Sequence, residues 1–429
     1  MRRLLLAAAA LVPALAAAGL TPDEEALVRA VKDRSPAALE LLERAVRVNS
    51  GTLNIEGVRE VGAIFARELA SLGFATRWVE MPEAMHRAGH LLAIRSGSRG
   101  KRLLLLGHID TVFEKASAAP LWNRAGPIVH GQGVNDMKGG DVVIVEALRA
   151  LAKVGALEGA TITVLLTGDE ERPGTPIAVA RAPLVEAARA SDVALSFEAI
   201  ARDKDGGYRA IPGRRGSSGW TLEVVAKPGH GAYIFSQESG YGAVFEGARI
   251  LDAFRREIHE EGLTFNPGLA AGGSSIQPDE STASATVSGK VNVIAARMHV
   301  EGDLRFLDPA QHDRAVARMR DIVAASLPGS HASLAIHDAY PPMPATEGNL
   351  RLLAAYSKAS DDAGLGAVGE IPATQRAAND IEFAAPFADS LDGLGTNGRG
   401  AHSDEEQMDL ASVERGAIRA ALLVYRLTR

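Results

Sequence analysis

The sequence of 429 residues contains no cysteine. The protein therefore has no disulfide, and any metal ion must be held by histidine, aspartate and glutamate. Long runs of charge, internal repeats and concentrations of glycine or proline are also missing, which argues against a disordered or fibrous protein. Acidic residues outnumber basic residues, and the net charge is -7 at pH 7. This acidic balance gives no sign of nucleic-acid binding.

The first 18 residues, MRRLLLAAAALVPALAAA, have the composition of a secretory signal peptide. Two arginines precede an apolar stretch that is too short to span a bilayer comfortably, and small residues suited to signal peptidase follow. We predict a signal peptide over residues 1–18 and a periplasmic or secreted protein that is free of the membrane after cleavage. An uncleaved anchor is the alternative. Loss of the two arginines would take the net charge from -7 to -9 (-7 minus 2).

The length exceeds what one hydrophobic core usually supports, so two domains are expected. Helical periodicity covers residues 22–48 and 55–72. Beyond them, apolar strands alternate with helices up to about residue 200, a pattern typical of a mostly parallel sheet covered on both faces. The sequence predicts an α/β domain formed by residues 19–213 and 341–429.

The pattern changes near residue 213, where strands begin to alternate apolar and polar side chains. Residues 214–340 read as strand, helix, strand, strand, helix, strand, which predicts an inserted α+β domain of ferredoxin-like type. Within it, the Gly-, Ser- and Thr-rich residues 272–289 are expected to form a mobile surface loop.

Polar side chains follow several apolar strands at the point where each strand should end. His108 and Asp110 follow four leucines, Glu170 and Glu171 follow TVLLTG, and Glu198 follows VALS. Ligands of open α/β sheets bind beyond the carboxyl ends of the strands. Taken singly, each feature is more simply a surface pair, a solvated turn or an exposed strand end. Together at one edge, so many carboxylates would need cations to be buried.

The same edge also receives Asp136, which lies in GVNDMKGG at the start of a helix and could by itself be an ordinary N-cap. Side chains two residues apart on a strand point the same way, so His108 and Asp110 can touch. Asp110 could then orient a metal-binding His108. Glu170 and Glu171 differ in direction, so one can bind a metal while the other handles a proton.

Five motifs in order, GHIDTV, GVNDMKGG, TGDEE, the strand-end acid and GAHSDEE, resemble the M20 family of co-catalytic zinc peptidases. Its members include glutamate carboxypeptidases, aminoacylases, succinyl-diaminopimelate desuccinylases and dipeptidases. The resemblance implies two Zn²⁺ ions, replaceable by Co²⁺ or Mn²⁺. One would be bound by His108, Asp136 and Glu198, and the other by Asp136, Glu171 and His402, with Asp136 as the bridge. It also implies a cis peptide bond after Asp136.

The resemblance further implies that Asp110 orients His108 and that Glu170 is the general base. The inserted domain would act as a lid and as the interface of a homodimer, and His230 would reach the active site of the partner subunit to steady the oxyanion. Arg209, Asn292 and Arg305 match positions near the substrate. The family's glycine-rich GGGTDA segment is replaced by RAANDIEFAA at residues 376–385. We expect the other histidines, among them His86, His90, His259, His312 and His337, on the surface.

We therefore predict an exported zinc hydrolase that cleaves an amide bond next to a free carboxylate in a small peptide or N-acyl amino acid. We favour a glutamate carboxypeptidase-like activity. The alternative is the activity of an N-acyl amino acid deacylase or of a dipeptidase. A non-catalytic binding protein of this fold is the alternative from another class. It predicts the loss of a metal ligand or of the base, yet all six residues are present.

Overall fold

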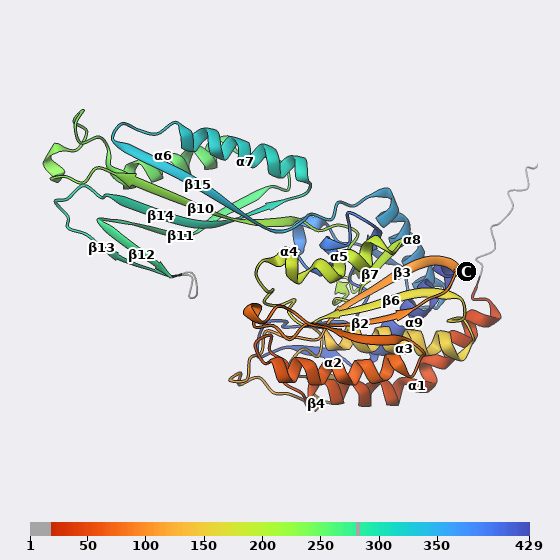
Figure 1. Ribbon diagram of the computed structural model, residues 1–429. Helices are drawn as coiled ribbons and strands as arrows, with labels where there is room; N and C mark the ends of the chain where they lie inside the picture. Colours follow the sequence, from red (N-terminus) through yellow and green to blue (C-terminus); the bar gives the residue numbers. More distant parts are fainter. Residues whose placement is uncertain (1–18, 280–283) are drawn as a thin grey trace, which may run out of the picture.

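The computed structural model describes residues 19–279 and 284–429, so the predicted signal peptide lies outside the described residues. Two units are evident (Figure 1). One has a central sheet and is called the catalytic domain after its predicted role; the other extends away from it and is called the lid for the same reason. In the described part of the chain, no helix is long and apolar enough to cross a membrane.

The catalytic domain is built on a six-stranded sheet with the order β1-β2-β6-β3-β7-β17. Strands β6, β3, β7 and β17 pair in parallel, whereas β2 is antiparallel to both of its neighbours. The predicted mostly parallel sheet is confirmed. The strands are β1 (Ala75–Val79), β2 (His90–Arg95), β6 (Ala160–Thr167), β3 (Arg99–His108), β7 (Val193–Ser196) and β17 (Asp389–Leu391).

Strand β3 shows why these segments form a covered sheet. Its leucines alternate between two hydrophobic clusters: Leu103 and Leu105 belong to one, and Leu104 and Leu106 to the other. A strand that is buried on both faces needs apolar residues at every position, and each fully buried leucine contributes about 1.5–3 kcal/mol. The apolar run therefore fixes β3 in the middle of the molecule.

Helices cover both faces of this sheet (Figure 1). One face packs on α1 (Pro22–Val46), α2 (Ile55–Ala70), α3 (Lys138–Lys153), α8 (Glu347–Asp362) and α9 (Ala411–Leu427). The helices α4 (Ile177–Ala180) and α5 (Ala182–Arg189) lie on the other side. Helix α1 begins with a capping box between Thr21 and Glu24, and the two helices expected near the N-terminus are confirmed.

Two small sheets complete the catalytic domain. One contains β16 (Val368–Glu370), β9 (Tyr208–Ala210) and β8 (Ala201–Arg202). The other contains β18 (Gly398–Arg399), β19 (Gln407–Asp409), β5 (Ile128–His130) and β4 (Asn123–Ala125). The second sheet joins the C-terminal segment to the loop before α3.

The lid is a four-stranded antiparallel sheet with helices on one face. Its strands have the order β11-β14-β10-β15, and the chain runs β10, α6, β11, β14, α7, β15 apart from an extra hairpin, which is the expected ferredoxin-like arrangement. The elements are β10 (Gly216–Ala226), α6 (Gly242–Glu257), β11 (Thr264–Gly273), β14 (Arg297–Phe306), α7 (Pro309–Ala324) and β15 (Ser330–Tyr340). The lid has its own hydrophobic cluster, which includes Trp220 and Phe254.

The prediction of a mobile loop over residues 272–289 is wrong for the described part of that segment. It forms a hairpin of β12 (Ser275–Asp279) and β13 (Ser284–Ser288), in which Ile276 pairs with Val287. The hairpin follows directly on β11. Cross-strand pairing holds a polar sequence in regular structure here.

Candidate metal centre and active site

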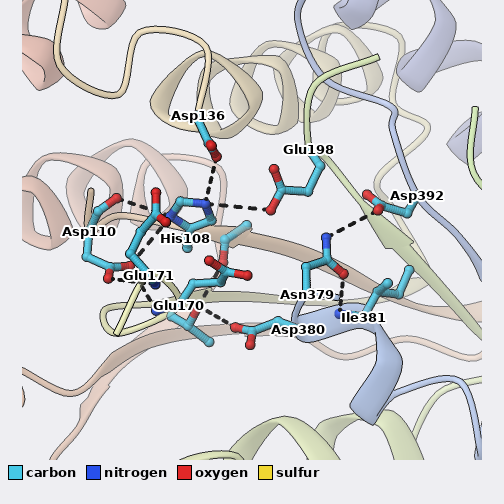
Figure 2. A network of polar contacts seen from close by, with 12 residues as sticks. His108, Asp110, Asp136, Glu170, Glu171, Glu198, Asn379, Asp380, Ile381 and Asp392 are labelled. Carbon is cyan, nitrogen blue, oxygen red and sulfur yellow. Dashed lines mark hydrogen bonds and ion pairs between the residues drawn. The ribbon is translucent and has the colours of Figure 1, made fainter. Parts of the chain in front are cut away.

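The carboxyl ends of three neighbouring strands bring the predicted residues to one place. In the parallel register His108 is opposite Thr167, so β3 and β6 end at the same level, and Leu106 is opposite Ser196, so β7 ends two residues earlier. The chain then delivers Glu170 and Glu171 just beyond β6, and Glu198 just beyond β7. Figure 2 shows these side chains gathered around His108.

The two oxygens of Asp136 face two different histidines. Oδ1 lies 3.2 Å from His108 Nε2, and Oδ2 lies 3.2 Å from His402 Nε2. Glu198 Oε1 is 3.6 Å from His108 Nε2, and Glu171 Oε2 is 3.1 Å from His402 Nε2. Each histidine thus shares Asp136 and has one glutamate of its own, which is the geometry of two adjoining cation sites joined by a carboxylate.

The loop before α3 holds Asp136 in position. Glu406 accepts hydrogen bonds from the backbone N–H groups of Gly133, Asn135 and Asp136 at 2.8–3.0 Å. The first turn of α3 approaches the end of β7 so closely that a Cβ on Gly140 would lie 2.0 Å from the carbonyl oxygen of Phe197. The glycine of the motif therefore lets the loop that carries Asp136 reach Glu198. The peptide bond after Asp136 is cis, as expected.

His402 comes from the opposite side of the cluster. It lies in the turn after β18 and has a φ of 63°, a left-handed conformation that costs a residue other than glycine about 1–3 kcal/mol. This conformation directs the imidazole towards Asp136 and Glu171. Its side chain is more exposed than those of the other four predicted ligands, so this side of the cluster faces the solvent.

Asp110 is fully buried and organises the loop that carries both glutamates. Its carboxylate accepts hydrogen bonds from the backbone N–H of Glu170 (3.0 Å) and Glu171 (3.2 Å) and from the Thr52 hydroxyl (2.6 Å). The predicted contact with His108 also exists: Nδ1 lies 3.5 Å from Asp110 Oδ1 and 3.1 Å from the Asp110 carbonyl oxygen. Asp110 therefore links the orientation of His108 to the position of both glutamates.

The charges of the cluster shift its pKa values strongly. Burial, reinforced by the negative charge of Asp136, raises the pKa of Glu198 to about 8. Burial likewise raises the pKa of Glu170 well above its usual range. Burial would also raise the pKa of Asp136, but hydrogen bonds from the two histidines outweigh it and lower that pKa. The hydrogen bonds to Asp136 and Glu171 raise the pKa of His402 to about 11. Asp136 and Glu171 therefore stabilise positive charge on His402, whereas burial favours the neutral forms of Glu170 and Glu198.

The donor set fits divalent metal ions. Among the described residues, the groups that could hold an ion are His108 with Asp136 and Glu198, Asp136 with Glu171 and His402, and His108 with Glu170 and Glu171. The first two are the predicted ligand sets. Glu171 Oε1 is buried and has no hydrogen-bond partner in the described part of the chain, as expected of an oxygen that binds a cation. The assignment of individual ligands stays a prediction.

The structure does not bring His230 and Asn292 to the cluster of the same chain. Strand β10 leaves the catalytic domain and runs for 11 residues, about 36 Å at 3.3 Å per residue, before the chain reaches His230. His230 and Asn292 are neighbours at the far end of the lid, where Gly231 N–H donates to the Asn292 carbonyl (2.7 Å). Both side chains are exposed. Their predicted roles therefore require the cluster of a second chain.

The two predicted substrate-binding arginines already have carboxylate partners. Arg209 on β9 donates to Asp203 Oδ2 at 2.6 Å, and Arg305 on β14 donates to Asp303 Oδ2 at 3.0 Å. A substrate carboxylate would have to compete with these partners. Neither arginine forms a hydrogen bond or ion pair with a predicted metal ligand in the described part of the chain.

Two buried arginine networks behind the cluster were missed from the sequence. Arg181 is fully buried and donates to Asp169 (2.6 Å) and Asp380 (2.5 Å), and Asp380 also accepts from the Thr167 hydroxyl. Arg214 pairs with Asp392, which also accepts from Asn379 (3.2 Å). The partners are far apart in the chain, and no local pattern marks them.

His90 corrects another expectation, because it is buried and not at the surface. Its Nδ1 accepts a hydrogen bond from the Gly168 N–H, and its Nε2 lies 2.9 Å from the Ala180 carbonyl oxygen. The sequence did contain a signal for this burial, because His90 begins the apolar segment HLLAIR.

An α/β domain with an inserted ferredoxin-like domain, and two adjoining sets of histidine and carboxylate side chains, fit the class of metal-dependent hydrolases. Residues 104–426 match the model of peptidase family M20/M25/M40, and the chain belongs to this family. The resemblance inferred from the five motifs is confirmed, and the protein is an enzyme of the metallopeptidase and amidohydrolase type.

Curated relatives cover much of the chain. Carboxypeptidase G2 of Pseudomonas sp. (strain RS-16) is 28% identical over 412 residues, which are 94% of this chain and 92% of that protein. Succinyl-diaminopimelate desuccinylase of Sphingopyxis alaskensis is 29% identical over 273 residues, 61% of this chain and 67% of that enzyme.

Solved structures share the fold at low identity. Aminopeptidase PepT of Bacillus cereus has a TM-score of 0.71 at 14% identity and covers 92% of this chain and 99% of its own. A dinuclear metal-binding M20 peptidase of Bacillus subtilis has a TM-score of 0.64 at 12% identity, with 92% and 99% covered.

Proposed function

We propose that this enzyme hydrolyses an amide bond next to a free carboxylate, as a carboxypeptidase-like amidohydrolase with two divalent metal ions, Zn²⁺ in the first instance. The observation that carries the proposal is the position of the Asp136 carboxylate between His108 and His402. The match to carboxypeptidase G2 over 94% of the chain supports the carboxypeptidase-like substrate class. An N-acyl amino acid deacylase or a dipeptidase would use the same centre.

The chain's own residues would divide the work. His108, Asp136 and Glu198 would hold one ion, and Asp136, Glu171 and His402 the other. When bound, the ions polarise the amide carbonyl and lower the pKa of water. Glu170 would take a proton from the attacking water and pass it to the amine nitrogen as the C–N bond breaks, so that the products are a carboxylate and an amine. Asp110 would hold Glu170 in place through its backbone N–H.

The proposal extends to location and assembly. The sequence of residues 1–18 supports export by a signal peptide, and the far end of the lid supports a homodimer. His230 and Asn292 are about 36 Å of strand away from their own catalytic domain, so they would serve the active site of a partner subunit. Light scattering of the purified protein tests the dimer.

The Glu170→Gln variant tests the proposed mechanism. The amide that replaces the Glu170 carboxylate cannot accept the proton, so we expect hydrolysis to fall by about 10²–10⁴-fold while both metal ions are retained. The substrates are a panel of N-acyl amino acids, dipeptides and folate-like glutamates, and metal content is measured by mass spectrometry. Glu186→Gln, on the exposed side of α5, is the matched control.

Each outcome bears on a separate part of the proposal. Loss of metal in Glu170→Gln would make Glu170 a ligand instead of the base. Full activity would remove it from the reaction. A wild-type protein that binds no metal and hydrolyses nothing in the panel would overturn the proposed function.

A further inference from the structure

One arginine beside the metal-ligand cluster lacks the carboxylate partner that three neighbouring arginines have. Arg376 follows the short helix η3 (Ala373–Gln375) and precedes η4 (Asp380–Phe383) in the catalytic domain. Arg376 is half-buried, and its Nε is fully buried without a hydrogen-bond partner in the described part of the chain. No ion pair of Arg376 is found there either. A buried N–H of a guanidinium without a partner is costly, because arginine cannot lose its proton to escape the penalty.

The segment that carries Arg376 is held rigidly. Arg214 pairs with Asp392 and donates to the carbonyl oxygen of Ala377, the residue after Arg376. Asn379 donates to Asp392 Oδ2 at 3.2 Å and caps η4 by accepting from the Ile381 N–H. Figure 2 shows Asn379 between Asp392 and Ile381. The backbone at Arg376 is therefore fixed by a buried network, so its side chain extends from a preorganised position.

The segment that follows Arg376 adjoins the cluster: Asp380 accepts a hydrogen bond from the Thr167 hydroxyl at the end of β6 (2.7 Å), and Asn379 and Asp380 lie near Glu170 and Glu198 (Figure 2). Burial lowers the pKa of Arg376, and Arg214 lowers it further, while Asp392, Glu198 and Asp136 act in the opposite direction. Glu198 and Asp136 belong to the first predicted metal-ligand set. The charges of that set therefore act on the Arg376 guanidinium.

Three other arginines nearby already have a carboxylate partner, whereas Arg215 donates only to oxygens of Gly262, Thr264 and Thr374. Arg214 has Asp392, Arg209 has Asp203, and Arg305 has Asp303. Arg376 combines partial burial, a fixed backbone and an unused donor next to the cluster. An arginine fork of this kind binds a carboxylate with two parallel hydrogen bonds.

We propose that Arg376 binds the free carboxylate of the substrate and so sets the preference for an amide bond next to that carboxylate. This inference rests on the proposed function, whose substrate class it makes specific. It assigns carboxylate recognition to a residue of the catalytic domain, in place of the lid arginine Arg305 and of Arg209. The carboxylate would supply the anion that this guanidinium lacks.

The test compares one N-acyl amino acid with its carboxamide in the wild type, Arg376→Gln and Arg376→Lys. We expect the wild type to prefer the carboxylate, and Arg376→Gln to lower this preference about 10²-fold or more, mainly through KM, because a buried charged partner is lost. Hydrolysis of the carboxamide should not change. Arg376→Lys keeps the charge without the fork and should lie between the two. Arg320→Gln, an exposed arginine on α7, is the matched control.

Binding provides a second readout. Calorimetry with the metal-loaded Glu170→Gln protein should show weaker binding of the N-acyl amino acid when Arg376→Gln is added, and unchanged binding with Arg320→Gln. An equal loss on both substrates, or an unchanged preference, would overturn the proposal. If the wild type hydrolyses no substrate, the proposed function fails. Calorimetry then still tests the role of Arg376, because unchanged binding of the carboxylate in Arg376→Gln would overturn that role.

Discussion

The catalytic domain and the lid each contain a buried histidine between carboxylates. His108 lies at the end of β3, and Asp136 and Glu198 reach it from two other segments. His299 lies within β14, an interior strand of the lid sheet, where Nδ1 contacts Glu223 of β10 and Nε2 lies 2.9 Å from Glu301 Oε1. The residue types are nearly the same, but only the first histidine belongs to a group that could hold a metal among the described residues.

The difference comes from position on the strand. In the middle of a sheet, the ladder register decides the neighbours: Glu223 pairs with His299, and Glu301 lies two residues along on the same face. Both imidazole nitrogens are then occupied. At the end of a parallel strand, loops from several strands converge, so His108 meets ligands that can be arranged around an ion.

Of the substitutions that test this comparison, replacement of Asp136, the ligand shared by both sets, should have the largest effect. Asp136→Asn removes the charge and one acceptor oxygen from both ligand sets. We expect the protein to lose bound metal and its hydrolytic rate to fall by about 10³-fold or more, since metal polarisation is worth several kcal/mol. Metal content and kcat/KM are measured on the same sample. Retention of two ions per chain would contradict the bridging position of Asp136.

A smaller effect is expected at Asp110, which contacts His108 but is not itself a predicted metal ligand. Asp110→Asn would place an amide where the Glu170 and Glu171 N–H groups need an acceptor. It would also weaken the orientation of His108. We expect metal affinity to fall about 10–100-fold, while saturating metal restores most of the activity. Competition with a chelator measures the affinity. An unchanged affinity would limit Asp110 to holding the loop.

The strand-end residues could be predicted because their signal is local. An apolar run that turns polar identifies both the strand and its end, and parallel strands put their ends at one edge. His108, Glu171 and Glu198 meet for this reason. Asp136 was expected at this edge because it lies at the start of a helix, whereas His402 was placed only by the family motifs, since its approach depends on a turn with positive φ.

The buried arginines could not be found in this way. Arg214 and Asp392 are 178 residues apart, and neither stands in a distinctive pattern. Arg376 is recognised only because the structure shows which arginines already have partners. The hairpin of β12 and β13 was missed for another reason: its sequence has few apolar residues, and cross-strand pairing rather than burial orders it.

The smallest effect should come from His299, the lid counterpart of His108. Burial opposes the charged form of His299, but the hydrogen bonds to Glu223 and Glu301 outweigh burial and raise its pKa above the usual 6.5. Its ionic contribution to stability is therefore complete below pH 6.5 and is lost as the pH rises through the raised pKa. His299→Gln should destabilise the lid by about 1–3 kcal/mol at about pH 6 and by less at about pH 9.

Urea unfolding can follow the lid alone, because Trp220 is the only tryptophan in residues 214–340 and lies in the lid core. A background in which Trp78 and Trp122 are replaced by Phe isolates its fluorescence. His331→Gln, at an exposed position of β15, is the control and should change little. Metal content should be unchanged in both variants. A loss of metal in His299→Gln, or a destabilisation that grows with pH, would show that His299 is more than an ion-paired residue of the lid sheet and would remove the contrast with His108.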